Sequence, residues 1–91
     1  MRGINKVILM GKLSAPEQVG SGTVKFSVVV ENHGAGTVMP CSVTCEATTK
    51  IADVILLLED GRQVYVEGRL TQREAGLVVT VDTLQVIGRV G

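Results

Sequence analysis

The sequence predicts an all-β domain that contains one short helix. Apolar residues alternate with other residues along most of the chain, which is the period of a strand with one buried face. Clusters of glycine, proline and asparagine interrupt this alternation, and a single window shows helical spacing instead. The 91 residues suit one domain, residues 1–91, and a composition of 45% apolar and 20% charged residues is sufficient for a core.

The alternation predicts five strands. Their ranges are Lys6–Leu13, Thr23–Glu31, Val38–Ala47, Arg62–Leu70 and Leu77–Val86. Gly11 predicts a bulge or a tight bend within the first strand, because glycine inside a strand marks such positions. Pro16 and the cluster Gly20–Gly22 are expected to end that strand.

The third strand carries both cysteines. The residues predicted to face inward are Val24, Phe26, Val28 and Val30 in the second strand, and Cys41, Val43, Cys45 and Ala47 in the third. In an extended strand the two cysteines stand about 13 Å apart, which is too far for a disulfide. His33 is the only histidine and completes no set of metal ligands. We therefore expect two reduced core thiols, no metal and no other cofactor.

The window after the third strand predicts the helix. An apolar stripe at helical spacing is formed by Ile51, Val54, Ile55 and Leu58. Thr48 or Thr49 is placed to cap its start, and Gly61 is placed as the glycine that follows its end. Three strands, a helix and two strands is the order of the OB-fold, a five-stranded Greek-key barrel. A five-stranded, sandwich-like sheet with the helix as a lid is the alternative.

Three segments carry a resemblance to a known family. They are RGINKVILMGKL at Arg2–Leu13, KIADV at Lys50–Val54 and GRQVYVEGRL at Gly61–Leu70. In this order they resemble the bacterial single-stranded DNA-binding protein. The resemblance implies an OB-fold that assembles as a homodimer or homotetramer and wraps single-stranded DNA without sequence preference, in DNA replication, recombination or repair. In size and in lacking the family's acidic tail, the chain is closer to PriB-type primosomal replication proteins, so replication or primosome proteins are further expected partners.

The chain departs from that family in its aromatic residues. The family stacks bases on tryptophans and a phenylalanine in the loop after the second strand, on the third strand and in the hairpin after the fourth. This chain has only Phe26 and Tyr65, and its short hairpin TQREAG contains Glu74 and Ala75 instead. Each stacked base contributes about 1–3 kcal/mol in single-strand binders. Binding is therefore expected to depend mainly on phosphate contacts.

Basic residues are the predicted nucleic-acid contacts. They are Arg2, Lys6, Lys25, Lys50, Arg69 and Arg73. The resemblance implies this role for four of them, while Lys25 and Arg69 lie where they can extend a positive groove. The alternative interpretation is that these cations only keep the strands soluble and discourage edge pairing.

A second set of residues is predicted to lie between subunits. Asn5 and Val7 belong to a first strand that can pair across a two-fold axis. Tyr65 shares a face with Gln63 and Glu67, and the resemblance implies that this face lies between subunits. Its amphipathic side chain suits an interface, and base stacking is the alternative. Phe26 shares a face with three valines and is assigned to the core rather than to base contact.

Two function classes remain open. The nine basic and nine acidic residues give a net charge of zero, which is unusual for a protein that binds polyphosphate. The chain is therefore either a weak, mainly electrostatic binder of single-stranded DNA or an OB-fold protein-interaction or structural module. It shows no constellation of an enzyme. It also lacks a membrane-spanning run and a secretion signal, so we expect a cytoplasmic protein without a membrane partner.

Overall fold

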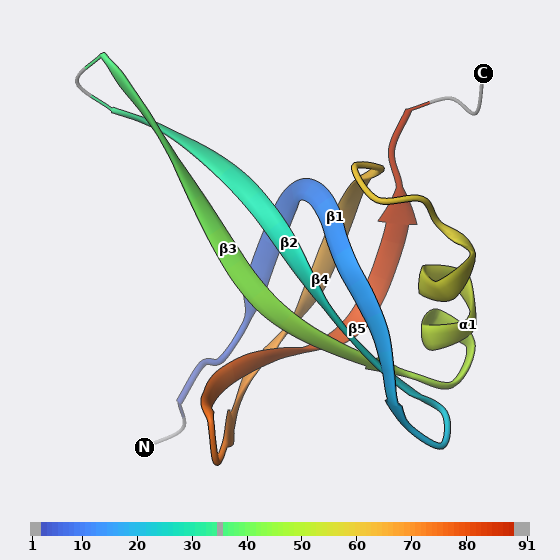
Figure 1. Ribbon diagram of the computed structural model, residues 1–91. Coiled ribbons are helices and arrows are strands. Elements are labelled where there is room, and N and C mark those ends of the chain that lie inside the picture. The colour runs from blue at the N-terminus through green and yellow to red at the C-terminus, as the bar shows by residue number, and fades with distance from the viewer. Residues whose placement is uncertain (1–2, 35, 89–91) are drawn as a thin grey trace.

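The computed structural model describes residues 3–34 and 36–88. Over these residues it contains five strands and one helix (Figure 1). In chain order they are β1 (Val7–Gly20), β2 (Thr23–Gly34), β3 (Thr37–Thr48), α1 (Thr49–Leu57), β4 (Gln63–Arg73) and β5 (Gly76–Val86). The predicted element order, with the helix between the third and fourth strands, is confirmed.

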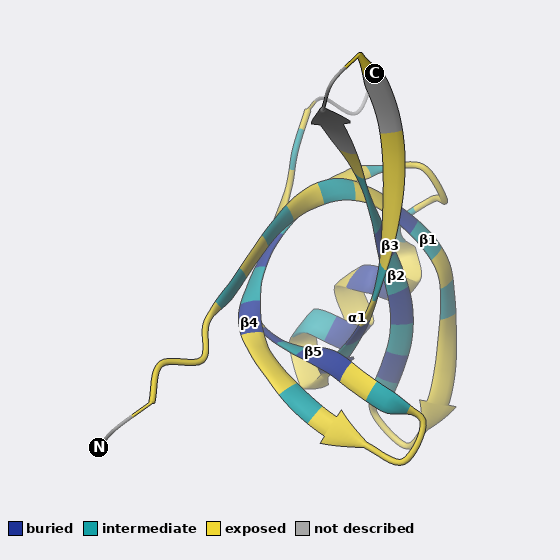
Figure 2. Ribbon diagram, turned by 90° about the vertical axis from the view of Figure 1, so that its left-hand side faces the viewer, coloured by how far each residue is buried: buried dark blue, intermediate teal, exposed yellow. Residues whose placement is uncertain are grey.

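The strands close into a barrel in the order β1-β2-β3-β5-β4. All neighbouring pairs are antiparallel except β3 and β5, which pair in parallel at Cys45–Val79 and Glu46–Thr80. Figure 2 shows the resulting ring of strands, with α1 lying across the opening of the barrel. The predicted OB-fold is confirmed, and the sandwich-like sheet is wrong.

Strand β1 is much longer than predicted, because it serves two neighbours. Residues Val7–Lys12 pair with β4, and residues Lys12–Gly20 pair with β2. The expected end at Leu13 is wrong, since Pro16 lies inside a register shift between Ser14 and Glu17. A proline is tolerated at such a bulge because no ladder hydrogen bond from its nitrogen is needed there.

Gly11 lies where β1 leaves β2, and the strand arches over the barrel at this region (Figure 1). Gly11 pairs in register with Val64, so it is not a bulge. A Cβ atom at this position would stand 2.3 Å from the carbonyl oxygen of Val29. Glycine is therefore required here for close approach of two backbones.

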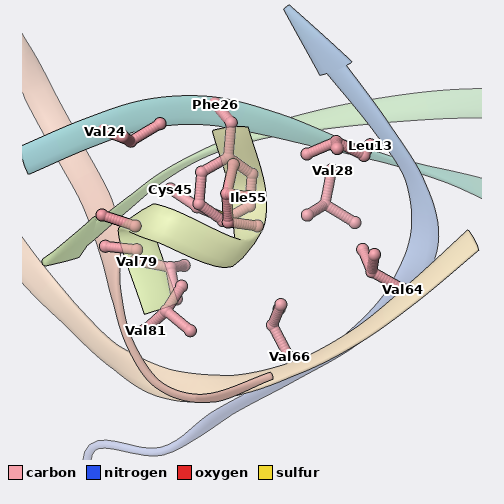
Figure 3. Packing of buried hydrophobic residues seen from close by; sticks show 12 residues of the cluster. Leu13, Val24, Phe26, Val28, Cys45, Ile55, Val64, Val66, Val79 and Val81 are labelled. Carbon is pink, nitrogen blue, oxygen red and sulfur yellow. The ribbon is translucent and has the colours of Figure 1, made fainter. Parts of the chain in front are cut away.

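The core lies inside the barrel and against α1 (Figure 3). Phe26 is 2% exposed, which confirms it as a core residue. Cys45 is fully buried, and desolvation raises the pKa of its thiol to about 12. The prediction that Cys41 is also a core residue is wrong, because this thiol is exposed. The hairpin of β2 and β3 projects beyond the barrel at this point (Figure 1), so inward alternation no longer means burial.

The helix differs from its prediction at both ends. Thr48 is the N-cap but makes no side-chain capping bond, and Gly61 is not the residue after the helix, because the C-cap is already Leu58. Instead the Gly61 N–H donates to the Leu13 carbonyl at 2.8 Å, which ties the following loop to β1. This nine-residue helix is the only one in residues 3–34 and 36–88, and it is too short to cross a bilayer.

The apolar stripe of the helix is also shifted from the predicted one. Ile55 is buried as expected, but Val54 is 40% exposed and Ala52 is buried in its place. A small side chain at this position lets the helix approach the barrel closely. Ile51 and Leu58 pack against the edge of the core.

Candidate nucleic-acid interface

The outer surface of β1, β2 and β3 is a polar face rich in hydroxyl groups. Directly paired residues point to the same side of a sheet, so the register defines its rows. The rows are Lys12–Val29–Ser42, Ser14–Ser27–Thr44 and Glu17–Lys25–Glu46. We call these nine residues the hydroxyl face. Its hydroxyls and lysines are donors of the kind that bind phosphate oxygens.

Two lysines of the hydroxyl face make no ion pair with any residue that the structure describes. Ion pairs within the described part of the chain are made by Lys6, Arg69 and Arg73, and by neither Lys12 nor Lys25. Lys12 is exposed and Lys25 is partly exposed. Both are therefore available to an anionic ligand without breaking an ion pair.

The β4–β5 hairpin brings an arginine onto this face. The β4–β5 ladder continues to Arg73 and Gly76, so only Glu74 and Ala75 form the turn. The prediction that the whole segment TQREAG, residues 71–76, is a polar turn is therefore wrong. The Arg73 Nε–H donates to the Glu46 carboxylate, and the nitrogen lies 3.2 Å from Oε1 and 3.3 Å from Oε2. The hairpin tip is thus joined to β3 by an ion pair.

The remaining predicted cations are placed differently. Arg69 donates to both carboxylate oxygens of Asp82, at 3.0 and 3.3 Å. Lys6 lies 3.6 Å from Glu67, and Lys50 is exposed in the first turn of α1. Arg2 lies outside the described residues.

The structure therefore assembles only part of the predicted site. Lys25, Glu46, Thr80 and Arg69 follow one another on adjacent strands β2, β3, β5 and β4. Sequence reasoning missed Lys12, although its alternation with the buried Leu13 is a signal for an outward position. The outward hydroxyls of β1 and β2 were missed because serine alone indicates no ligand.

An open groove of about 340 Å³ adjoins the hydroxyl face where β1, β2 and β4 diverge. Its lining consists of Met10, Gly11, Lys12, Val29, Val30, Glu31 and Gln63. Lys12 and Val29 belong to both the groove and the hydroxyl face. Its lining mixes apolar with charged and polar side chains and includes no aromatic side chain.

A second surface, formed by β1 and β4, has a different character. Ile8 and Met10 are 56% and 53% exposed, and they pair with Glu67 and Tyr65 of β4. We call these four residues the β1–β4 wall. The Tyr65 hydroxyl donates to Glu67 at 2.5 Å, which raises the pKa of Tyr65 and lowers the pKa of Glu67. The wall combines exposed apolar side chains with a polar network.

The other residues predicted for an interface have contacts within the chain. The Asn5 side chain accepts from the Leu70 N–H at 2.8 Å and donates to the Leu70 carbonyl at 2.9 Å. The Asn5 side chain thus extends the hydrogen bonding along the β4 backbone beyond the point where β1 starts. The Val7 side chain packs against the core. Tyr65 is the one of the three whose side chain belongs to the outer wall.

Comparison with known proteins supports the architecture. No family model matches the sequence, and no curated protein sequence matches it significantly. Among solved structures, PriB from Ralstonia solanacearum superimposes with a TM-score of 0.77 at 18% identity, over 92% of this chain and 98% of that one. The similarity is to an OB-fold.

Two small single-stranded DNA-binding proteins also superimpose on the chain. The protein from Streptomyces coelicolor has a TM-score of 0.73 and 20% identity, over 96% of this chain and 95% of that one. The protein from Mycoplasma pneumoniae has a TM-score of 0.73 and 10% identity, over 91% and 93%. The resemblance stated from the sequence motifs is therefore matched by similarity of the whole fold.

Proposed function

We propose that this protein binds single-stranded DNA across the hydroxyl face, without sequence preference and mainly through the phosphates. The observation that carries the proposal is the presence of Lys12 and Lys25 among serine and threonine hydroxyls, with no ion pair to either lysine from residues 3–34 and 36–88. OB-folds bind oligonucleotides on the face of their second and third strands. The fold is shared with PriB and with two proteins named for single-stranded DNA binding.

The binding is expected to be weak. Phe26 is buried and Tyr65 lies on the β1–β4 wall, so no aromatic ring stands on the hydroxyl face. Carboxylates of Glu17 and Glu46 stand on the same face and repel phosphates. These features suit an accessory binding protein of replication, recombination or repair, and not an enzyme.

A salt titration with labelled oligo-dT tests this proposal. For single strands, the logarithm of the affinity falls with the logarithm of salt concentration by about 0.7 per phosphate neutralised. Replacing Lys12 and Lys25 together by alanine is therefore expected to make this slope shallower by about 1.4. The control is Lys6→Ala, which removes a cation that Glu67 already neutralises on the other wall, and it is expected to leave the slope near that of the wild type. Fluorescence anisotropy measures both.

Two results would contradict the proposal. Binding that barely responds to salt is incompatible with phosphate contacts as the main source of affinity. An equal effect of Lys6→Ala and of the double variant would show that net charge matters and the hydroxyl face does not. Absence of binding at low salt would favour the alternative function, an OB-fold protein-interaction or structural module that has lost most nucleic-acid binding.

We also propose that the β1–β4 wall joins copies of the chain into a homodimer or homotetramer. The supporting observation is the pair Ile8 and Met10, exposed beside a strand edge. Residues Val7–Gly11 pair with β4 only, so their other edge has no partner strand among the described residues. Exposed apolar groups beside such an edge are typical of an interface.

Sedimentation equilibrium tests the oligomer. The expected mass at micromolar concentration is a multiple of 9.6 kDa. Replacing Ile8 and Met10 by lysine is expected to shift the protein to a monomer, because two apolar contacts would be replaced by charges that must be removed from water on assembly. Met39→Lys is the matched control, since Met39 is 62% exposed on the projecting β2–β3 hairpin. A wild-type monomer at this concentration would refute the assembly.

A further inference from the structure

Glu46 occupies an unusual position for a carboxylate on a surface proposed to bind DNA. It lies at the β3 edge of the hydroxyl face, next to β5, and its side chain is only 14% exposed. The Arg73 guanidinium covers it from the β4–β5 hairpin and contacts both of its oxygens. Within the described part of the chain, this is the least exposed carboxylate that takes part in an ion pair.

The neighbours of Glu46 on both sides are groups that bind anions. Lys25 is its direct partner on β2, and Thr80 is its direct partner on β5. The Thr80 hydroxyl is 2.7 Å from the Thr71 hydroxyl, so the hydroxyl groups continue onto β4. A lysine, an arginine and a threonine from three different strands therefore surround one internal carboxylate.

We propose that Glu46 stands in for a phosphate group between Lys25 and Arg73, and so holds a phosphate-binding position closed. This inference rests on the proposed function and adds a regulatory contact to the same site. A carboxylate and a phosphate accept hydrogen bonds from the same guanidinium donors with similar geometry. A DNA phosphate that enters this position must displace Glu46 from Arg73. The free energy needed to break this ion pair lowers the affinity of the hydroxyl face for DNA.

The variant Glu46→Gln tests this inference directly. The amide keeps the size of the side chain but removes its charge, so the ion pair with Arg73 is lost and the negative charge beside Lys25 is removed. The affinity for labelled oligo-dT at 0.1 M salt is expected to rise about tenfold, since like-charge repulsion across an interface is costly. The slope against salt is expected to become steeper by about 0.7, the value for one additional phosphate.

Two matched variants separate a local effect from a change in net charge. Glu59→Gln removes one negative charge from the loop after α1, and its affinity is expected to change less than twofold, because exposed charges are screened beyond about 10 Å at 0.1 M salt. When Arg73→Ala is added to Glu46→Gln, the slope of affinity against salt is expected to lose the increase that Glu46→Gln alone produces. A gain in Glu59→Gln equal to that in Glu46→Gln would overturn the inference.

A measurement without DNA keeps the inference separable from the proposed function. In Glu46→Gln, addition of pyrophosphate is expected to shift the NMR signal of the Arg73 Nε–H, whereas the wild type shows a much smaller shift. Wild-type DNA binding with no gain in Glu46→Gln would overturn the inference and leave the proposed function standing. A pyrophosphate response in a protein that binds no DNA would support the inference and refute the proposed function. Equal responses of wild type and variant to pyrophosphate would also overturn the inference.

Discussion

Replacing Phe26 by alanine is expected to lower the free energy of unfolding by about 3–5 kcal/mol. Phe26 is the largest of the fully buried side chains, and it lies beside Cys45 and Ile55 in the centre of the barrel (Figure 3). Its removal leaves a cavity that the closed sheet cannot collapse to fill, because the strands are held by ladders on both sides. Since small domains have a total stability of about 5–15 kcal/mol, this loss approaches the stability of the whole fold. Urea unfolding followed by circular dichroism measures the change.

Phe26→Leu is the control that links this result to function. Leucine retains most of the apolar volume, so we expect a loss of about 1 kcal/mol and a folded protein. Because Phe26 points into the core, this variant should bind oligo-dT with the same salt slope as the wild type. A marginal cost of Phe26→Ala, or a selective loss of DNA binding in Phe26→Leu, would show that the ring contacts bases and not the core.

Replacing Gly68 by alanine is expected to cost about 3 kcal/mol for a different reason, which is overpacking. Gly68 follows a register shift in β4, where the backbone of β5 approaches closely. A Cβ atom here would stand 2.1 Å from the carbonyl oxygen of Thr80 and 2.9 Å from its carbonyl carbon. Neither atom belongs to a flexible side chain, so one strand must move relative to the other. Thermal and urea unfolding measure the cost.

Gly20→Ala is the matched control for this substitution. Gly20 also ends a paired segment, but a Cβ atom there would meet nothing within 4 Å. Its effect on the free energy of unfolding is expected to stay within about 0.5 kcal/mol. Equal stabilities of the two alanine variants would show that β4 and β5 do not approach each other as closely as described.

The sequence alone was sufficient for the order of the elements and for most of the core. The alternation of Val24, Phe26 and Val28 identified a buried face, and the helical spacing around Ile55 placed the one helix between the third and fourth strands. These patterns are local, since a period of two or 3.6 is visible within ten residues. Burial then follows wherever the element is part of the barrel. Where β2 and β3 leave the barrel, the same pattern failed for Cys41.

The ends of the elements and the pairing of charges depended on the tertiary structure. Strand β1 passes Pro16 because β2 supplies a partner on its far side, which the residues around the proline do not indicate. Arg73 meets Glu46 across 27 positions in sequence, and Arg69 meets Asp82 across a hairpin. A list of basic residues cannot distinguish such neutralised cations from Lys12 and Lys25, which make no ion pair within the described part of the chain. Residue type and period establish which side chains face outward, but closure of the barrel decides which charges meet, because contacts between strands distant in sequence exist only after the chain has folded.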